Sequence, residues 1–155
     1  MRKNLMHLWA FALVAAACVS LTACDSEEEG EEVNLLAGTQ WAEDGQLWNG
    51  KVAHYFTYIF DDTYLTVGYL RNNGDESWIK ETTAKFKYVL KGDTFTYSNT
   101  KGVSGTAKWF STADGRMIVD WPEGSGSPQQ VWYPLAGEVK KLYDNAVEVD
   151  EESGK

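Results

Sequence analysis

Apolar and polar residues alternate along most of the chain from residue 52 to residue 133, and this period of two constrains the fold most. In the clearest stretch, 82–90, Ala84, Phe86, Tyr88 and Leu90 alternate with lysines and other residues. Successive side chains of a β-strand point to opposite faces, whereas the apolar side of a helix recurs every three to four residues. The pattern therefore predicts strands with one apolar face each, at 52–60, 64–71, 82–90, 94–97, 105–110, 117–121 and 131–133.

Short polar segments separate these expected strands. They are Asp61-Asp62, 72–75, 91–93, 98–102, Asp114-Gly115 and the Gly/Ser/Pro-rich stretch 122–128. Tight turns join strands that are antiparallel neighbours, so we expect an all-β meander of seven or eight strands. Sequential pairing favours a small up-and-down barrel, because closure removes the unpaired edges of the sheet. A sandwich of two sheets is the alternative.

Aromatic residues are abundant in the segment from 33 to 135, which has six tryptophans, seven tyrosines and five phenylalanines. About one hundred residues make one small domain, and each ring buries about 150–250 Å². The expected interior faces accommodate most of the rings. Five rings in or beside the expected turns or outside the interior pattern are candidate ligand contacts: Trp48, Trp78, Trp132, Tyr64 and Tyr69. The alternative for the three tryptophans is packing against neighbouring loops.

The N-terminus has the layout of a secretory signal. Arg2 and Lys3 precede an uncharged apolar run at 8–19, which is shorter than the roughly 20 residues that span a membrane. The following Leu21-Thr22-Ala23-Cys24 resembles the lipobox of bacterial lipoproteins. This resemblance implies that residues 1–23 are a signal peptide and that Cys24 is acylated. The alternative is an ordinary signal peptide that is cleaved near Ala23.

Residues 25–32 form an acidic run with six carboxylates and no apolar side chain, so we expect 24–33 to be a disordered linker. The run resembles the export signal that sends some Gram-negative lipoproteins to the outside of the outer membrane. That resemblance implies display on the cell surface, and the alternative is a solvated spacer. After the domain at 34–135, Val139, Leu142 and Tyr143 indicate a short helix, and we expect a loose acidic tail from Asp144.

Most of the net charge of −9 comes from the two ends of the chain. Residues 33–135 carry eleven acidic and nine basic side chains, a net charge of −2, without a basic patch. Nucleic-acid binding needs clustered lysine and arginine, so we expect no nucleic-acid partner. The sequence does not indicate an oligomeric state.

The segment 36–41, Leu-Ala-Gly-Thr-Gln-Trp, is followed within the meander by Lys-Tyr-Val-Leu-Lys-Gly-Asp-Thr-Phe at 87–95. Together these look like the small lipocalin-like domains of bacterial lipoproteins, over residues 34–135. The resemblance implies a barrel that can enclose a small apolar ligand, with Trp41 as a plug at one end. It implies no catalytic residue.

Few residues offer chemistry. His54 is the one histidine after Cys24, so a zinc site lacks ligands, and no nucleophile elbow is present. Asp44, Asp61-Asp62 and Asp75-Glu76 lie in expected turns, where carboxylates favour the turn itself. We therefore expect no catalytic residue, metal or cofactor, and a non-enzymatic protein that binds a small apolar ligand. The alternatives are a surface adaptor that holds a glycan or protein through exposed tryptophans, and a small hydrolase that uses paired carboxylates.

The lipobox resemblance generates the first prediction. Cys24→Ala should release the chain from the membrane fraction or leave the signal uncleaved, because stable attachment needs the buried acyl chains. Fractionation of cells followed by immunoblotting measures this. A substituted protein that is both cleaved and membrane-bound would contradict the prediction.

Overall fold

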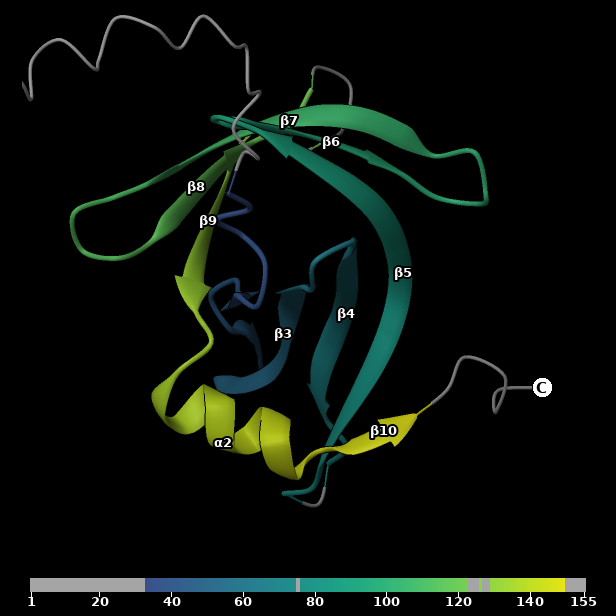
Figure 1. Cartoon of the computed structure of the whole chain (residues 1–155). Coiled ribbons are helices and arrows are strands. Elements are labelled where there is room, and N and C mark those ends of the chain that lie inside the picture. The colour runs from purple at the N-terminus through teal and green to yellow at the C-terminus, as the bar shows by residue number, and fades with distance from the viewer. Residues whose placement is uncertain (1–32, 75, 123–125, 127–128, 150–155) are drawn as a thin grey trace, which may run out of the picture. The chain divides into compact units, whose positions relative to one another are not determined.

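The structure is a computed structural model that describes residues 33–74, 76–122, 126 and 129–149. The expected signal peptide, Cys24, the acidic linker up to residue 32 and the last residues of the tail lie outside the described residues. The described part is almost entirely β-structure, as the alternation predicts (Figure 1).

The strands follow one another along the chain, and each expected strand is present with small shifts at its ends. They are β1 (Gln40–Ala42), β2 (Gln46–Trp48), β3 (Lys51–Phe60), β4 (Tyr64–Asn72), β5 (Trp78–Lys91), β6 (Thr94–Ser98), β7 (Ser104–Ser111), β8 (Met117–Asp120), β9 (Gln129–Pro134) and β10 (Val147–Val149). The helix α2 (Gly137–Asn145) connects β9 to β10. The turns between β3 and β9 lie where the polar segments predict them.

Eight of these strands form a closed antiparallel barrel. From β3 to β9 each strand pairs with the next, and β1 pairs with both ends of this series. Trp41 of β1 lies opposite Tyr58 of β3 on one side and opposite Pro134 of β9 on the other. This closure confirms the up-and-down barrel and excludes the two-sheet sandwich. The short β2 lies outside the circle and extends the sheet along the beginning of β3.

Strand β5 is long and strongly curved, and it carries the barrel around one side (Figure 1). Its beginning pairs with β4 and its end with β6. The register with β4 shifts between Val67 and Gly68, which is a β-bulge that lets the strand bend. A Cβ at Gly68 would lie 2.4 Å from the carbonyl oxygen of Glu81, so this close approach requires glycine.

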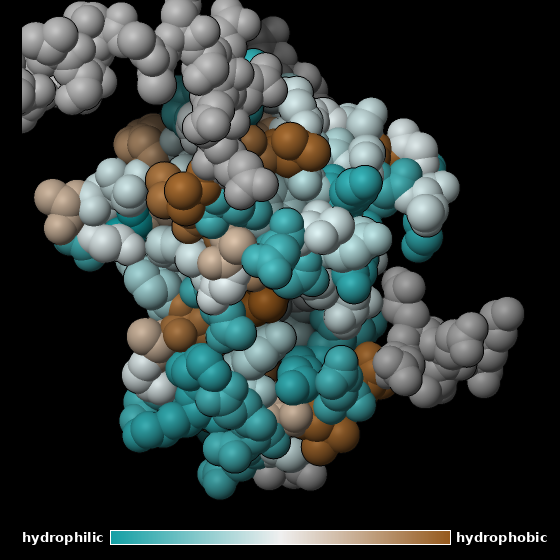
Figure 2. Space-filling model, viewed as in Figure 1, coloured by the Kyte–Doolittle hydropathy of each residue, from teal (hydrophilic) through white to brown (hydrophobic). Residues whose placement is uncertain are grey.

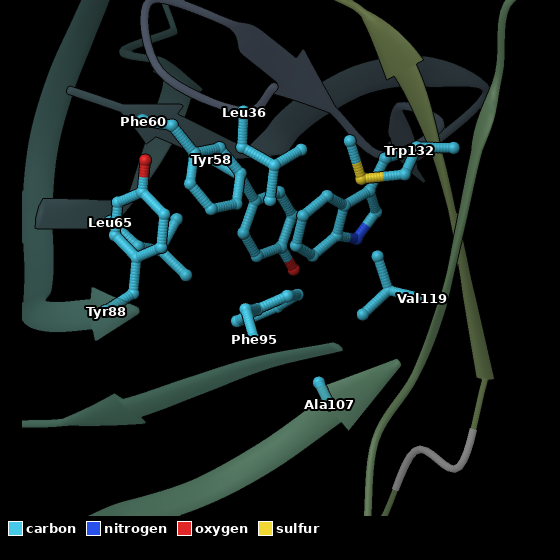
Figure 3. Packing of buried hydrophobic residues seen from close by; sticks show 10 residues of the cluster. Leu36, Tyr58, Phe60, Leu65, Tyr88, Phe95, Ala107, Val119 and Trp132 are labelled. Carbon is cyan, nitrogen blue, oxygen red and sulfur yellow. The ribbon is translucent and has the colours of Figure 1, made fainter. Parts of the chain in front are cut away.

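Aromatic rings fill much of the interior (Figure 3). Tyr58 stacks on Trp132 with 3.8 Å between ring centroids, and Phe60 meets both Tyr88 and Phe95 edge to face. Phe60, Phe95 and Trp132 are at most 1% exposed. Such ring pairs add stability beyond the area that they bury, so this cluster is the main core.

The segment before β1 closes one end of the barrel, here called the closed end. Residues 35–38 form a turn whose Leu36 side chain is 1% exposed and belongs to the core. Asn34 Nδ2 donates to the Tyr88 hydroxyl at 2.8 Å, and the Gly38 amide donates to the Phe60 carbonyl at 2.9 Å. These bonds fix the turn next to the β3–β4 and β5–β6 turns, which lie at the same end.

The helix α2 lies outside the barrel, beneath β3 and β4 in Figure 1. Tyr143 and Glu148 border a small cleft against the outer face of β3–β5, and Lys80 Nζ lies 5.1 Å from the Tyr143 ring centroid. This cover explains why the outward-facing Thr57 is buried. The outer surface around it is largely hydrophilic, with small separate apolar patches (Figure 2).

The expectation of a loose tail from Asp144 is wrong for its first part. The helix continues to Asn145, and Val147–Val149 form β10. This strand pairs in parallel with the beginning of β5, with Val147 opposite Ile79. The free edge of β5 beyond β6 supplies the backbone partners, which no local sequence pattern of the tail reveals. Within the described ranges, the structure has no helix with the length and apolarity to cross a membrane.

The closed end generates the second prediction. Leu36→Ala should lower the free energy of unfolding by about 2–5 kcal/mol, because it leaves a cavity in the core. Leu35→Ala is the matched control, since its side chain is 65% exposed and should change stability by less than about 0.5 kcal/mol. Urea unfolding followed by tryptophan fluorescence measures both. Equal losses in the two variants would contradict the role of Leu36.

Candidate functional site

The barrel interior is not completely filled. A cavity of about 300 Å³ remains beside the aromatic core and opens to solvent. Its lining comes from five strands and two connections: Tyr58, Leu65, Val67, Phe86, Tyr97, Val103, Trp121 and Gln130. Val103 lies in the β6–β7 connection and Trp121 directly follows β8. Both are at the end of the barrel opposite Leu36, which we call the mouth. Ligand pockets start at about this volume.

Small residues make room for the cavity. On neighbouring strands Val67 lies opposite Ala84, where two larger side chains would fill the space. Tyr97 lies opposite Gly105, and a Cβ on Gly105 would be 2.4 Å from the Tyr97 hydroxyl. The glycine therefore allows the Tyr97 ring to lie across β7 and to form a wall of the cavity.

Gln130 is the polar centre of the lining. Its Oε1 accepts hydrogen bonds from Trp121 Nε1 at 2.6 Å and from Trp132 Nε1 at 3.1 Å. Two indole donors on one oxygen determine the orientation of the amide. Gln130 is the one amide side chain among the residues that line the cavity.

Tyr58 places a hydroxyl next to this amide. Its hydroxyl donates to Glu43 Oε1 and lies 3.4 Å from Gln130 Oε1. Burial, together with the hydrogen bond and charge of Glu43, raises the pKa of Tyr58 above its ordinary value. The phenol therefore stays neutral at physiological pH and remains a donor. The cavity combines apolar walls with one polar corner made by Gln130, Tyr58 and Glu43.

The structure corrects the placement of Trp132. The sequence suggests that Val131 and Tyr133 face inward and that Trp132 lies outside the core. Instead, Trp132 is fully buried, and Tyr133 faces outward, where its hydroxyl donates to Asp44 Oδ2 at 3.3 Å. The β8–β9 register decides this, because it sets Trp132 opposite the buried Met117. Both faces of β9 are apolar, so alternation alone could not choose between them.

The other candidate rings lie apart from one another, and none of them lines the cavity. Trp48 is 74% exposed on β2, next to the exposed Leu47. Trp78 is half-buried, and its ring centroid lies 5.9 Å from that of Tyr55. Tyr64 is exposed under Lys85, whose Nζ is 4.5 Å from the ring centroid. Tyr69 packs on Phe56 with 4.7 Å between centroids.

Trp41 packs against the core near the closed end, and its Nε1 donates to Thr39 Oγ1 at 2.8 Å. Phe86, Tyr97 and Trp121 belong to the rings that the expected interior faces accommodate, and the alternation gives them no part in a site. It did not single out Gln130. A signal was available, because a glutamine that alternates with Trp132 on an apolar strand needs a buried partner.

Among the described residues, no three potential metal ligands come together. Asp61 illustrates the role of the turn carboxylates. Its Oδ1 accepts the backbone N–H groups of Thr63 and Tyr64 at 2.7 and 2.6 Å, and these bonds lower the pKa of Asp61. The carboxylate therefore stabilises the β3–β4 turn.

No family model matches the chain, and neither a curated protein nor a solved structure is significantly similar to it.

The polar corner generates the third prediction. Gln130→Leu should lower the free energy of unfolding by about 1–3 kcal/mol, because it leaves the buried Trp132 N–H without an acceptor. Gln129→Leu is the matched control, since Gln129 is exposed and bonds only to Asp120 at the surface. Thermal unfolding of both variants checks this. Similar stabilities of the two variants would contradict the role of the Gln130 amide.

Proposed function

We propose that this chain is a lipid-anchored, surface-exposed lipoprotein whose lipocalin-like barrel binds a small apolar ligand without catalysis. The observation that carries the proposal is the open cavity of about 300 Å³ with walls of Tyr58, Phe86, Tyr97 and Trp121. Eight-stranded barrels are either filled by their own side chains or hold one small ligand. Here the closed end is filled and the mouth is not, which favours binding.

The described chain enters the barrel at the closed end, opposite the mouth. Asn34 is held at the closed end by its bond to Tyr88, whereas Val103 borders the cavity at the mouth. Nine residues separate Asn34 from the anchor at Cys24, and they span at most about 32 Å.

A second candidate function is attachment to a glycan or protein through the β2–β3 hairpin. Leu47 and Trp48 are 68% and 74% exposed on β2, which ends the row of paired strands. Asn49 and Gly50 have positive φ angles of 51° and 75°, as a tight hairpin turn requires. An exposed tryptophan on a short rigid hairpin is suited to stacking.

The fourth prediction tests the cavity with N-phenyl-1-naphthylamine, a neutral apolar dye whose fluorescence rises in dry surroundings. The protein is the whole mature chain with Cys24→Ser, so that neither lipid nor detergent competes. We expect one dye per chain. Val67→Trp should weaken binding at least about tenfold by filling the cavity, whereas the outward-facing Val89→Trp should change it less than about twofold.

Overpacking can also unfold the barrel, so Val103→Trp provides a second obstruction at the mouth, where the side chain is 51% exposed. Thermal unfolding shows that each variant is folded. Failure of the dye to bind the folded protein, or equal binding by the Val67 and Val89 variants, contradicts the proposal. Loss of binding in Trp48→Ala alone would favour the hairpin as the binding site.

A further inference from the structure

The cavity has an uncharged lining with a negative charge at one corner. None of the lining side chains carries a charge at neutral pH. The charged group that is hydrogen-bonded to the lining is the carboxylate of Glu43, through the Tyr58 hydroxyl. An uncharged apolar pocket with a carboxylate at one corner distinguishes among ligands by their charge.

Glu43 owes its position to the barrel closure. Its backbone N–H donates to the Phe56 carbonyl at 3.1 Å, which continues the β1–β3 ladder by one residue. Side chains two residues apart on a strand share a face, so Glu43 points to the same side as Trp41, which packs against the core. The side chain is half-buried, and the hydrogen bond from Tyr58 holds it at the edge of the cavity.

The walls next to this carboxylate are aromatic rings that stand nearly perpendicular to one another. Tyr97 meets Phe86 at 85° with 5.5 Å between centroids, and it meets Trp121 at 84° and 5.4 Å. Rings at right angles present faces in different directions around one space. The face of an aromatic ring is electron-rich and attracts ammonium groups within about 6 Å, with tryptophan the strongest.

A basic partner for an anionic ligand is missing from the lining. Arg71 lies on the inner face of β4, four residues from Val67, but it pairs with Glu81 at 3.8 Å. An anion in the cavity would lose its hydration and would lie near Glu43 and the electron-rich ring faces, with no positive side chain to compensate. A cation would lose its hydration too, but Glu43 and the rings would compensate for it.

We propose that the cavity prefers an organic cation, an amine or quaternary ammonium with an apolar body, over neutral or anionic molecules of the same size. This inference deepens the proposed function and depends on it. The apolar body lies against Leu65 and Val67, and the ammonium group lies between Glu43 and the rings of Tyr97 and Trp121.

The test compares three ligands with the same eight-carbon chain: octyltrimethylammonium, 1-octanol and octanoate. Each displaces N-phenyl-1-naphthylamine from the whole mature chain with Cys24→Ser at about 150 mM salt, where attraction between distant surface charges is largely screened. We expect half-displacement by octyltrimethylammonium at a concentration about tenfold lower than by octanol, with octanoate the weakest. Octanol binding as tightly as the cation would overturn the inference.

The acidic chain attracts any cation weakly, so two matched variants separate the site from the overall field. Glu43→Gln keeps an oxygen acceptor for Tyr58 and removes one negative charge. Asp44→Asn removes one charge from the next residue, whose exposed side chain contacts Tyr133 on the outer face. Glu43→Gln should reduce the preference for the cation over octanol to less than about threefold, and Asp44→Asn should leave it unchanged.

The measurements distinguish the cation preference from the binding of an apolar ligand. Equal preferences in Glu43→Gln and Asp44→Asn would overturn the inference, because the charge at the corner would then be irrelevant. Binding of the dye and octanol without a preference for the cation would leave the apolar cavity standing and remove the cation site. Absence of dye binding in the folded, unsubstituted protein would contradict the proposed function and the inference together.

Discussion

The pairing of one three-residue strand with both ends of the meander determines the architecture. Strand β1 contributes only Gln40–Ala42, yet its bonds to β3 and β9 convert a row of hairpins into a closed barrel. Without that pairing, β3 and β9 would be open edges, and the inward faces would have no common interior. The same ladder continues to Glu43, so the strand that closes the barrel also places the charged group beside the cavity.

The interior has two parts with different packing. Toward the closed end, Leu36 and the interlocking rings of Phe60, Tyr88 and Phe95 leave no room, and this part supplies much of the stability. Toward the mouth, Val67 opposite Ala84 leaves space. A filled half and an open half allow the barrel to be stable without disulfides while keeping a site accessible to solvent.

The indole and phenol groups explain how polar atoms are tolerated in this aromatic interior. Trp121 and Trp132 each have one buried donor, and the single oxygen of Gln130 accepts from both. Tyr58 is satisfied by Glu43. Because every one of these donors has a partner, the corner is polar without being destabilising.

The sequence by itself determined the strands, their turns and the all-β class, because these follow from a period of two and from local turn chemistry. Residues 82–90 and the Asp61-Asp62 turn show this directly. The inward face of β9 was decided only by the tertiary structure, since its register with Met117 buries Trp132. The same holds for the cavity, for the cover over Thr57 and for β10, which depend on partners far apart in the chain. A local pattern fixes which side chains share a face, and long-range pairing alone decides which face is inside.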